Sequence, residues 1–373
     1  MNKPLVSVFI SYYNDAKFLR KSIESVLAQN FCDFQLILLN HASTDNSREI
    51  AHSFNDKRII HIDKRHNAGA GCGLLLRDML AHATGRYIKF FCADDVMRPN
   101  CIGTLVDFME RNADCAMVCS RMDFIDHLGR SINYKNVACG GGDLTARDIM
   151  RQLMRGETSI YYPTVMVRRS ALEHAYIDDS AITTLDIGMW CDLLSRGGRM
   201  HYLDDKLVSY RIHDANVSRM FDGRMDPRLF FERIPYSAII NNITDIETVR
   251  DLCSDVPYVA KLGPRDKKYI PFIFAVHNMK GDDISAAISG YIYLHGLMNM
   301  PRMRDALIRR FGFSVREFRD LYVNSHAFNK YLQNAAKYIG AGTLLKLILR
   351  RILHFIAPKN WRWNLFRQTM NKS

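Results

Sequence analysis

The chain has 373 residues, 48% of them hydrophobic, and a formal net charge of +12 at pH 7. This length exceeds the usual single domain, so we expect one large domain and a smaller appendage. The charge favours an anionic partner, such as nucleic acid, a phosphorylated substrate or an acidic membrane surface. No run of about 18 uninterrupted apolar residues occurs, and no charged-then-apolar leader precedes Leu5, which predicts a protein that is neither exported nor membrane-spanning.

Strands and helices alternate through residue 119. The expected strands are 5–10, 35–39, 58–62, 87–91 and 116–119, and the helices between them are 17–29, one from Ser43 or Thr44 to 54, 74–82 and 100–112. This alternation predicts an α/β fold with a Rossmann-like, mostly parallel sheet flanked by helices. From about residue 225 the pattern is helical, with helices expected at 270–279, 284–297, 303–311 and 315–323. We therefore expect a domain at 1–222 and a C-terminal helical region at 223–373.

Two adjacent carboxylates, Asp94 and Asp95, follow the strand 87–91 and precede Pro99. Open α/β sheets bind ligands at the carboxyl ends of their strands. Adjacent side chains of extended backbone point to opposite sides, so both can face one ion only if the chain turns between them. We expect Asp95 to bind a hard divalent cation, Mn²⁺ or Mg²⁺, and Asp94 to reach a ribose or to order the loop. The alternative is that both acids cap the next helix.

The loops narrow the choice of nucleotide. The turn after the first strand has no glycine and no Walker loop occurs, which argues against NAD, FAD and the common ATPases and GTPases. A glycine-rich run, 69–73, leads into the helix that carries Arg77. The backbone amides of this run could bind a phosphate of the donor, and Arg77 on the following helix is then a donor-binding candidate. Alternatively, the glycines provide flexibility only.

Five ordered segments between residues 4 and 220 together resemble the inverting glycosyltransferase family 2, which has the GT-A fold. They are VSVFISYYNDAKFLRKSIESVLAQNFCDFQLILLNHASTDNS, the Asn67 and Gly69 turn, TGRYIKFFCADD, LDIGMWCDLLSRGG and YRIHDANVS. The resemblance implies a nucleotide-sugar donor and a metal-assisted transfer. It implies donor-binding residues Tyr13, Asn14, His41, Asp45 and Asp94, metal ligands Asp95 and His213, a catalytic base Asp186 and an acceptor contact Trp190.

Three positions depart from that family's pattern. His41 stands where an acid usually contacts a uracil ring, Cys92 stands in the place of the first acid of the Asp-x-Asp-Asp form, and Leu185 replaces a Glu before Asp186. The donor base is therefore left open, while the acid that would do the chemistry is kept.

The residues around Asp186 support a catalytic role. Inverting transfer needs one base for the acceptor hydroxyl and a positive charge for the departing diphosphate. Asp186 precedes Met189 and Trp190, so we expect it in the first turn of a helix, where the helix N-terminus favours its ionised form. The alternatives are a plain helix cap for Asp186, a core residue for Trp190 and a surface residue for His213.

The C-terminal residues 331–373 contain eight Lys or Arg and no Asp or Glu, two thirds of the net charge. A basic face that includes Lys346 and Arg350 lies opposite an apolar face, and Trp361 and Trp363 follow. We expect residues 343–367 to bind an anionic membrane surface. A helix packed on the domain is the alternative, and nucleic acid is not expected because no reader motif accompanies the charge.

These observations predict a metal-dependent inverting hexosyltransferase. It would move a sugar from a nucleotide-diphosphate sugar, with a UDP-sugar favoured, to a hydroxyl of a glycan or lipid-linked saccharide. Nine cysteines, with no CxxC pair and no zinc-type Cys/His spacing, indicate reduced thiols and a cytoplasmic protein. We expect it at the inner face of the cell membrane, in cell-surface polysaccharide synthesis. The alternatives are a sugar nucleotidyltransferase and a non-catalytic binding subunit.

Overall fold

The structure is a computed structural model. It describes residues 3–67, 72–134, 141–145, 148–149, 152, 159–177, 179, 185–214, 216, 245–282 and 284–331. The chain divides into two compact units, Met1–Phe274 and Ala275–Ser373. The boundary expected at 222/223 and the membrane-binding segment expected at 343–367 lie outside the described residues, and both stay predictions.

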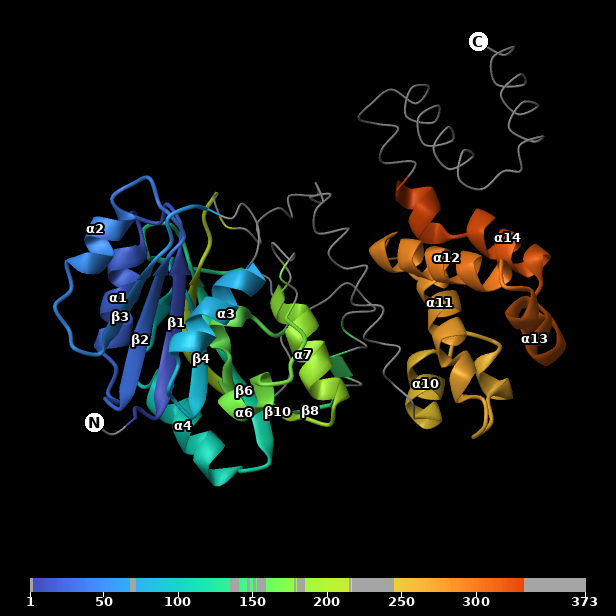
Figure 1. Cartoon of the computed structure of the whole chain (residues 1–373), viewed down its shortest axis with the longest axis horizontal. Coiled ribbons are helices and arrows are strands. Elements are labelled where there is room, and N and C mark those ends of the chain that lie inside the picture. The colour runs from blue at the N-terminus through green and yellow to red at the C-terminus, as the bar shows by residue number, and fades with distance from the viewer. Residues whose placement is uncertain are drawn as a thin grey trace, which may run out of the picture. The chain divides into compact units, whose positions relative to one another are not determined.

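Within the described ranges, the first unit holds one ten-stranded sheet with the order β3-β2-β1-β4-β9-β6-β10-β5, with β7 beside β6 and β8 beside β10 (Figure 1). The strands are β1 (Val6–Tyr12), β2 (Phe34–Asn40), β3 (Ile59–Asp63), β4 (Tyr87–Cys92), β5 (Val96–Met97), β6 (Cys115–Ile125), β7 (Ser131–Ile132), β8 (Gly142–Leu144), β9 (Met166–Arg168) and β10 (Arg199–Arg211). The long pairings of β1 with β2 and β4, of β2 with β3 and of β6 with β10 are parallel. The shorter pairings, such as β9 with β4 and β6, are antiparallel. The expected mostly parallel α/β sheet is confirmed.

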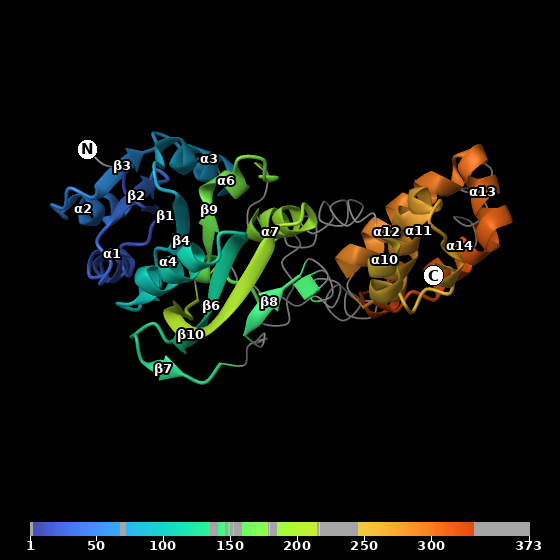
Figure 2. The same ribbon diagram turned by 90° about the horizontal axis from the view of Figure 1, so that it is seen from below.

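Helices cover both faces of this sheet. They are α1 (Leu19–Leu27), α2 (Ser47–His52), α3 (Cys72–His82), α4 (Cys101–Arg111), α6 (Arg169–Leu172) and α7 (Leu185–Ser195). A further helix of the first unit, α10 (Ile246–Leu252), is not one of them. Figure 2 shows α1 and α4 on one face and α3 and α7 on the other. Strand β1 explains the arrangement, because its even-numbered residues such as Val8 lie in one core cluster with Ile23 of α1. On the other face Phe9 meets the ring of Phe90, which meets Trp190 of α7. A central parallel strand is thus apolar on both sides.

Two features of the first unit differ from the sequence pattern. The expected cap of α2 at Ser43 or Thr44 is wrong, because α2 begins at Ser47 and the Ser43 hydroxyl instead accepts a hydrogen bond from the N–H of Asn14. The pattern also did not predict β5, β7, β8, β9 and β10. Most of them are short, and the long β10 has register shifts around Lys206 that break its alternation.

The second unit is helical in its described part. Helix α11 (Ile270–Lys280) crosses the division between the units, and α12 (Ile284–Met298), α13 (Pro301–Phe311) and α14 (Val315–Val323) follow. Gly312, with φ of 73°, ends α13, and a capping box of Ser314 and Glu317 begins α14. All four helices lie where the sequence pattern predicts them. Over the described residues, none of the helices combines the length and apolar character needed to span a membrane.

Candidate functional site

One edge of the sheet collects the carboxyl ends of β1, β2, β4, β6 and β10, because these strands run in the same direction. The loops that leave this edge carry most of the residues singled out in the sequence. They are Tyr13 and Asn14 after β1, His41 and Asp45 after β2, Asp94 and Asp95 after β4, and His213 after β10.

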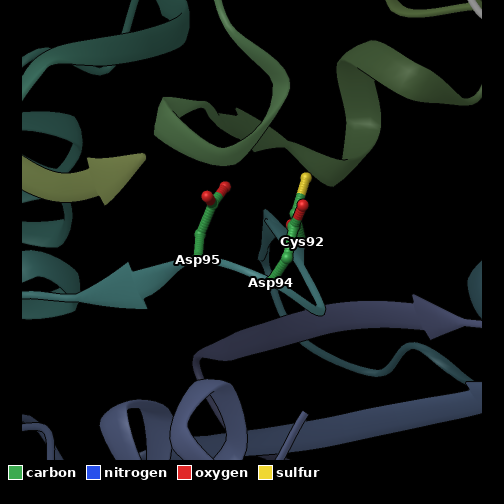
Figure 3. A group of neighbouring side chains, drawn as sticks. All are labelled: Cys92, Asp94 and Asp95. Carbon is green, nitrogen blue, oxygen red and sulfur yellow. The ribbon is translucent and has the colours of Figure 1, made fainter. Parts of the chain in front are cut away.

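Cys92, Asp94 and Asp95 form a compact group at this edge. Strand β4 ends at Cys92, and the chain turns at residues 93 and 94 before β5 begins. The Cys92 sulfur and one oxygen from each carboxylate lie within 4.8 Å of one another. Figure 3 shows the three side chains extending to the same side of this turn. The turn therefore supplies the condition under which two adjacent aspartates can face one ion.

Asp95 is buried with one oxygen unsatisfied. Asp95 is 1% exposed, and its Oδ1 accepts a hydrogen bond of 2.8 Å from the backbone N–H of Arg211. Its Oδ2 has no hydrogen-bond partner in the described part of the chain. Burial, together with repulsion from Asp94, raises the pKa of Asp95 well above its usual range. Burying a carboxylate oxygen without a hydrogen-bond partner is costly, so these residues fit a divalent cation that would bring positive charge to this oxygen.

Asp94 holds the loop that follows β10. Its Oδ2 pairs with Nε2 of His213 at 2.9 Å and accepts a hydrogen bond from Nδ2 of Asn216 at 3.0 Å. Oδ1 of Asn216 in turn accepts the backbone N–H of His213. These contacts correspond to the loop-ordering role considered for Asp94. His213 as a metal ligand stays a prediction, since its Nε2 faces Asp94 here.

Arg211, the last residue of β10, was not predicted as a site residue. It is 1% exposed, and its Nε donates to the carbonyl oxygen of Asp94 at 2.7 Å while Nη1 donates to that of Asp126 at 2.9 Å. Its guanidinium lies 4.7 Å from the ring centre of Phe18. Arg211 thus places a permanent positive charge beside the two carboxylates. The only signal in the sequence was its position two residues before His213.

Asn14 and Asp45 join the loops after β1 and β2. Asn14 has a left-handed backbone, with φ of 56°, and its Oδ1 accepts the N–H of Thr44 at 2.8 Å. Oδ2 of Asp45 accepts the N–H of Ala16 at 3.1 Å. Both predicted donor residues therefore also have a structural role in this loop pair.

Tyr13 and His41 lie beside each other, with ring centres 6.2 Å apart in an edge-to-face arrangement. Tyr13 is 45% exposed, whereas His41 is 8% exposed. Burial, and then the charge of Lys64, lowers the pKa of His41, so its imidazole is neutral at pH 7. The pair offers an aromatic surface next to a neutral hydrogen-bonding group.

Asp15 is a second residue that the sequence did not single out. It is partly buried, and its Oδ2 accepts the N–H of Tyr13 at 3.0 Å. Burial, with repulsion from Asp94 and Asp45, raises the pKa of Asp15 to about 6. A cavity of about 680 Å³ opens beside it. The cavity is lined by Asn14, Asp15, Lys17, Phe18, Asp126, His127, Ile132, Ile212, His213 and Asp214.

Asp186 lies in the first turn of α7, as expected. Burial raises the pKa of the thiols of Cys92 and Cys191, and the charge of Asp186 adds to the rise in both. The helix N-terminus acts on the pKa in the expected direction, because the backbone N–H of Ile187 donates to the Asp186 carboxylate and lowers the pKa of Asp186. Burial outweighs this effect and raises the pKa of Asp186 to about 6.

The remaining candidates lie away from the carboxylates' hydrogen-bond network. Trp190 is 1% exposed and its ring centre is 5.4 Å from that of Phe90, which fits the core alternative; its acceptor contact stays a prediction. Leu185 is also buried, at 6% exposure. Arg77 donates to Asp179 at 2.7 Å and to the carbonyl oxygen of Ile177, in the segment before α7. Its role toward a donor stays a prediction.

Known proteins resemble both the sequence and the fold. Residues 7–175 match the sequence model of Glycosyl transferase family 2. An uncharacterized glycosyltransferase of Methanocaldococcus jannaschii is 29% identical over 233 residues, which are 59% of this chain and 76% of the relative. An uncharacterized glycosyltransferase of Nostoc sp. is 29% identical over 219 residues, 57% of this chain and 66% of the relative.

A solved structure extends the likeness in shape. Residues 1–349 of S. aureus TarS, in complex with UDP-GlcNAc, superpose with a TM-score of 0.58 at 16% identity and cover 88% of this chain and 92% of that one. At this identity the likeness shows the fold.

Proposed function

We propose that residues 7–175 form a glycosyltransferase domain of glycosyl transferase family 2 with the GT-A fold. On this premise the protein uses a nucleotide-diphosphate sugar as donor, with a UDP-sugar favoured. The acceptor would be a hydroxyl of a glycan or lipid-linked saccharide, and the sugar, a hexose, would be transferred with inversion. TarS, which shares the fold, was solved with UDP-GlcNAc, a donor of this class. We place the reaction at the cytoplasmic face of the cell membrane, in cell-surface polysaccharide synthesis.

One observation carries the proposal: Asp95 lies in a group with Asp94, and its buried Oδ2 has no hydrogen-bond partner among the described residues. Asp95 would hold a Mn²⁺ or Mg²⁺ ion through this oxygen. When bound, such an ion neutralises part of the charge that develops on the departing diphosphate. Arg211 and His213 would keep the Asp94–Asp95 turn in place for it.

Asp186 would act as the base. As the acceptor oxygen forms its bond to the anomeric carbon, the bond from that carbon to the diphosphate breaks, and the hydroxyl proton moves to the Asp186 carboxylate. A pKa of about 6 suits this task, because the carboxylate is mostly ionised at pH 7 and yet binds a proton more readily than an exposed aspartate.

The donor loops would bind the nucleotide. Tyr13 would provide an exposed aromatic surface and His41 a neutral polar group for a base, and Asn14 and Asp45 hold these two loops together. The position of His41 in place of an acid leaves the choice of base to be measured.

Hydrolysis of a panel of nucleotide sugars, with and without Mn²⁺, tests the proposal. We expect one donor to be hydrolysed, and to raise the Tm of the protein, only when metal is present.

Asp95→Ala should lower transfer by at least about a hundredfold, because it removes the oxygen that would hold the ion. Asp123→Asn is the matched control, since this carboxylate pairs with Arg98 and Ser209 and should leave the metal dependence unchanged. Normal turnover by Asp95→Ala at limiting metal would remove Asp95 from this role.

A further inference from the structure

The carboxylate group includes a sulfur atom that a hard cation does not need. Mg²⁺ and Mn²⁺ prefer oxygen ligands, whereas a thiolate with carboxylates is a ligand set that Zn²⁺ and Cd²⁺ accept. Cys92 is partly buried, and its sulfur lies within 4.8 Å of an oxygen of Asp94 and an oxygen of Asp95. Figure 3 shows its side chain on the same side of the turn as both carboxylates.

We infer that Cys92, Asp94 and Asp95 form a mixed sulfur and oxygen site for a thiophilic divalent cation of the zinc class, with the Cys92 sulfur as a ligand. Binding forms a metal–sulfur bond, breaks the S–H bond and releases one proton to water. The two carboxylates remain bound as oxygen ligands.

The geometry supports a site rather than a lone cysteine. In a tetrahedral zinc site, a sulfur at about 2.3 Å and an oxygen at about 2.1 Å from the ion lie about 3.6 Å apart. The Cys92 sulfur and the two carboxylate oxygens lie within 4.8 Å of one another, so side-chain movements of about 1 Å bring them onto one ion. The Oδ2 of Asp95 is buried and has no partner in the described part of the chain, which leaves it available as a ligand.

Asp94 is already oriented by its neighbours. His213 and Asn216 both contact its Oδ2, at 2.9 and 3.0 Å. Contacts of this kind from outside a metal site fix the direction of a ligating group and commonly raise metal affinity by about tenfold to a hundredfold. The protein therefore supplies an ordered carboxylate next to the thiol.

The site has one consequence for catalysis, and this consequence, unlike the site itself, rests on the proposed function. A zinc-class ion would use the same Asp95 oxygen as the Mn²⁺ or Mg²⁺ of the transfer reaction. The two kinds of ion should therefore exclude each other.

Cadmium titration of the full-length protein tests the inference, because cadmium bound to a thiolate gives an ultraviolet charge-transfer band. The titration is done in a Cys32→Ser background, since Cys32 is an exposed thiol. We expect one saturating equivalent, displaced by Zn²⁺ and, at higher concentration, by Mn²⁺. Cys92→Ser should remove the band, and Asp95→Asn should weaken binding by at least about tenfold. Cys101→Ser, which changes another buried thiol, should keep the titration unchanged.

An unchanged band in Cys92→Ser, or cadmium affinity in Asp95→Asn equal to that of the parent, would overturn the inference. X-ray absorption of the zinc-loaded parent requires no variant at Cys92: we expect a sulfur neighbour at about 2.3 Å, and a shell of oxygen and nitrogen only would equally overturn it. No nucleotide sugar is present in these measurements. Absent transfer with an intact band would therefore count against the proposed function alone, and metal-dependent transfer without a band against the zinc-class site alone.

Discussion

Asp95 is a buried carboxylate and Asp186 is a partly buried one, and their surroundings differ. Asp95 lies next to a second carboxylate, and its Oδ2 has no partner among the residues that the structure describes, so it gains most from a cation. Burial raises the pKa of Asp186 to about 6, so its carboxyl group can both lose and hold a proton near neutral pH. Two carboxylates whose surroundings differ in this way are suited to separate roles, one as a ligand and one as a base.

Replacing the proposed base should separate catalysis from donor binding. Asp186→Asn keeps the shape of the side chain but cannot accept the proton, so we expect transfer to fall by at least about a hundredfold while donor affinity persists.

The same substitution should raise the free energy of unfolding at neutral pH. A carboxyl whose pKa is raised on folding destabilises the protein above that pKa, so the variant should be more stable at pH 7, by at most about 3 kcal/mol, and the gain should disappear below about pH 4.

Asp192 offers the control on the same helix. Both of its oxygens are occupied, by the N–H of Tyr176 and by Nε of Arg196, and it is 2% exposed. Asp192→Asn should therefore lower the Tm and leave the rate of the folded enzyme near normal. Equal loss of donor affinity and of transfer in Asp186→Asn would instead make Asp186 a donor-site residue.

The rate of transfer should depend on pH through Asp186. Because its pKa is about 6, the base is protonated as the pH falls through 6, and kcat should drop about tenfold for each further pH unit. Asp15 has a similar pKa, so Asp15→Asn is the informative comparison. We expect this variant to keep the acidic limb of the pH profile, and loss of the limb would assign it to Asp15.

Residue identity could be predicted from the sequence where a motif places a side chain at a strand end, as for Asp94 and Asp95. The direction in which the pKa of Asp186 shifts could not be predicted from the sequence, because burial depends on which side chains surround the first turn of α7. Arg211 was missed for a related reason: its partners, Asp94, Asp126 and Phe18, come from three other parts of the chain.

At the scale of elements, the apolar runs of β1 to β4 and the helical periods of α11 to α14 were sufficient to predict those segments. Strand β10 was not predicted, since Asp204 and Asp205 interrupt its apolar pattern and its register shifts there. This strand nevertheless positions the turn after β4. Its last residue contacts Asp95 through the backbone and Asp94 through the side chain.

The end of β10 should therefore control metal affinity. Arg211→Lys keeps the positive charge but loses the paired contacts to the carbonyl oxygens of Asp94 and Asp126, so the turn is held less firmly. We expect the Mn²⁺ concentration that gives half of the metal-induced rise in Tm to increase at least about tenfold. The backbone contact to Asp95 is retained in this variant.

Arg168→Lys provides the matched control. Arg168 also holds carbonyl oxygens, those of Cys115, Met109 and Asn112, but on β9 and away from the carboxylates. This variant should lose stability while its Mn²⁺ dependence stays unchanged. If both variants lost stability and neither changed the Mn²⁺ dependence, Arg211 would have only a structural role.

At the scale of the whole molecule, the charge of residues 331–373 remains the feature without an assigned role. We expect residues 343–367 to bind anionic membranes, where each basic side chain near the surface contributes about 1 kcal/mol. Removal of residues 343–373 should release the protein from anionic vesicles and reduce transfer to a lipid-linked acceptor. Donor hydrolysis should persist, because the site residues all precede residue 217.

A higher salt concentration should release the full-length protein from anionic vesicles as the truncation does, since screening weakens attraction to a charged surface. Cosedimentation with vesicles of anionic and neutral lipid measures both effects. A full-length protein that ignored anionic vesicles at low salt would contradict membrane binding. An insoluble truncated protein would assign the segment to the folded core.

The contacts around the Asp94–Asp95 turn join distant parts of the chain: Arg211 and His213 lie between 116 and 119 positions after the aspartates that they contact. A ribosome releases β4 long before β10. A nascent chain that ends at residue 175, where the family match ends, already holds the neighbouring strands β1 to β4 but neither Asp186 nor Arg211. We therefore expect the growing polypeptide to form this part of its sheet first, and to fix the carboxylate turn only after β10 emerges and pairs with β6.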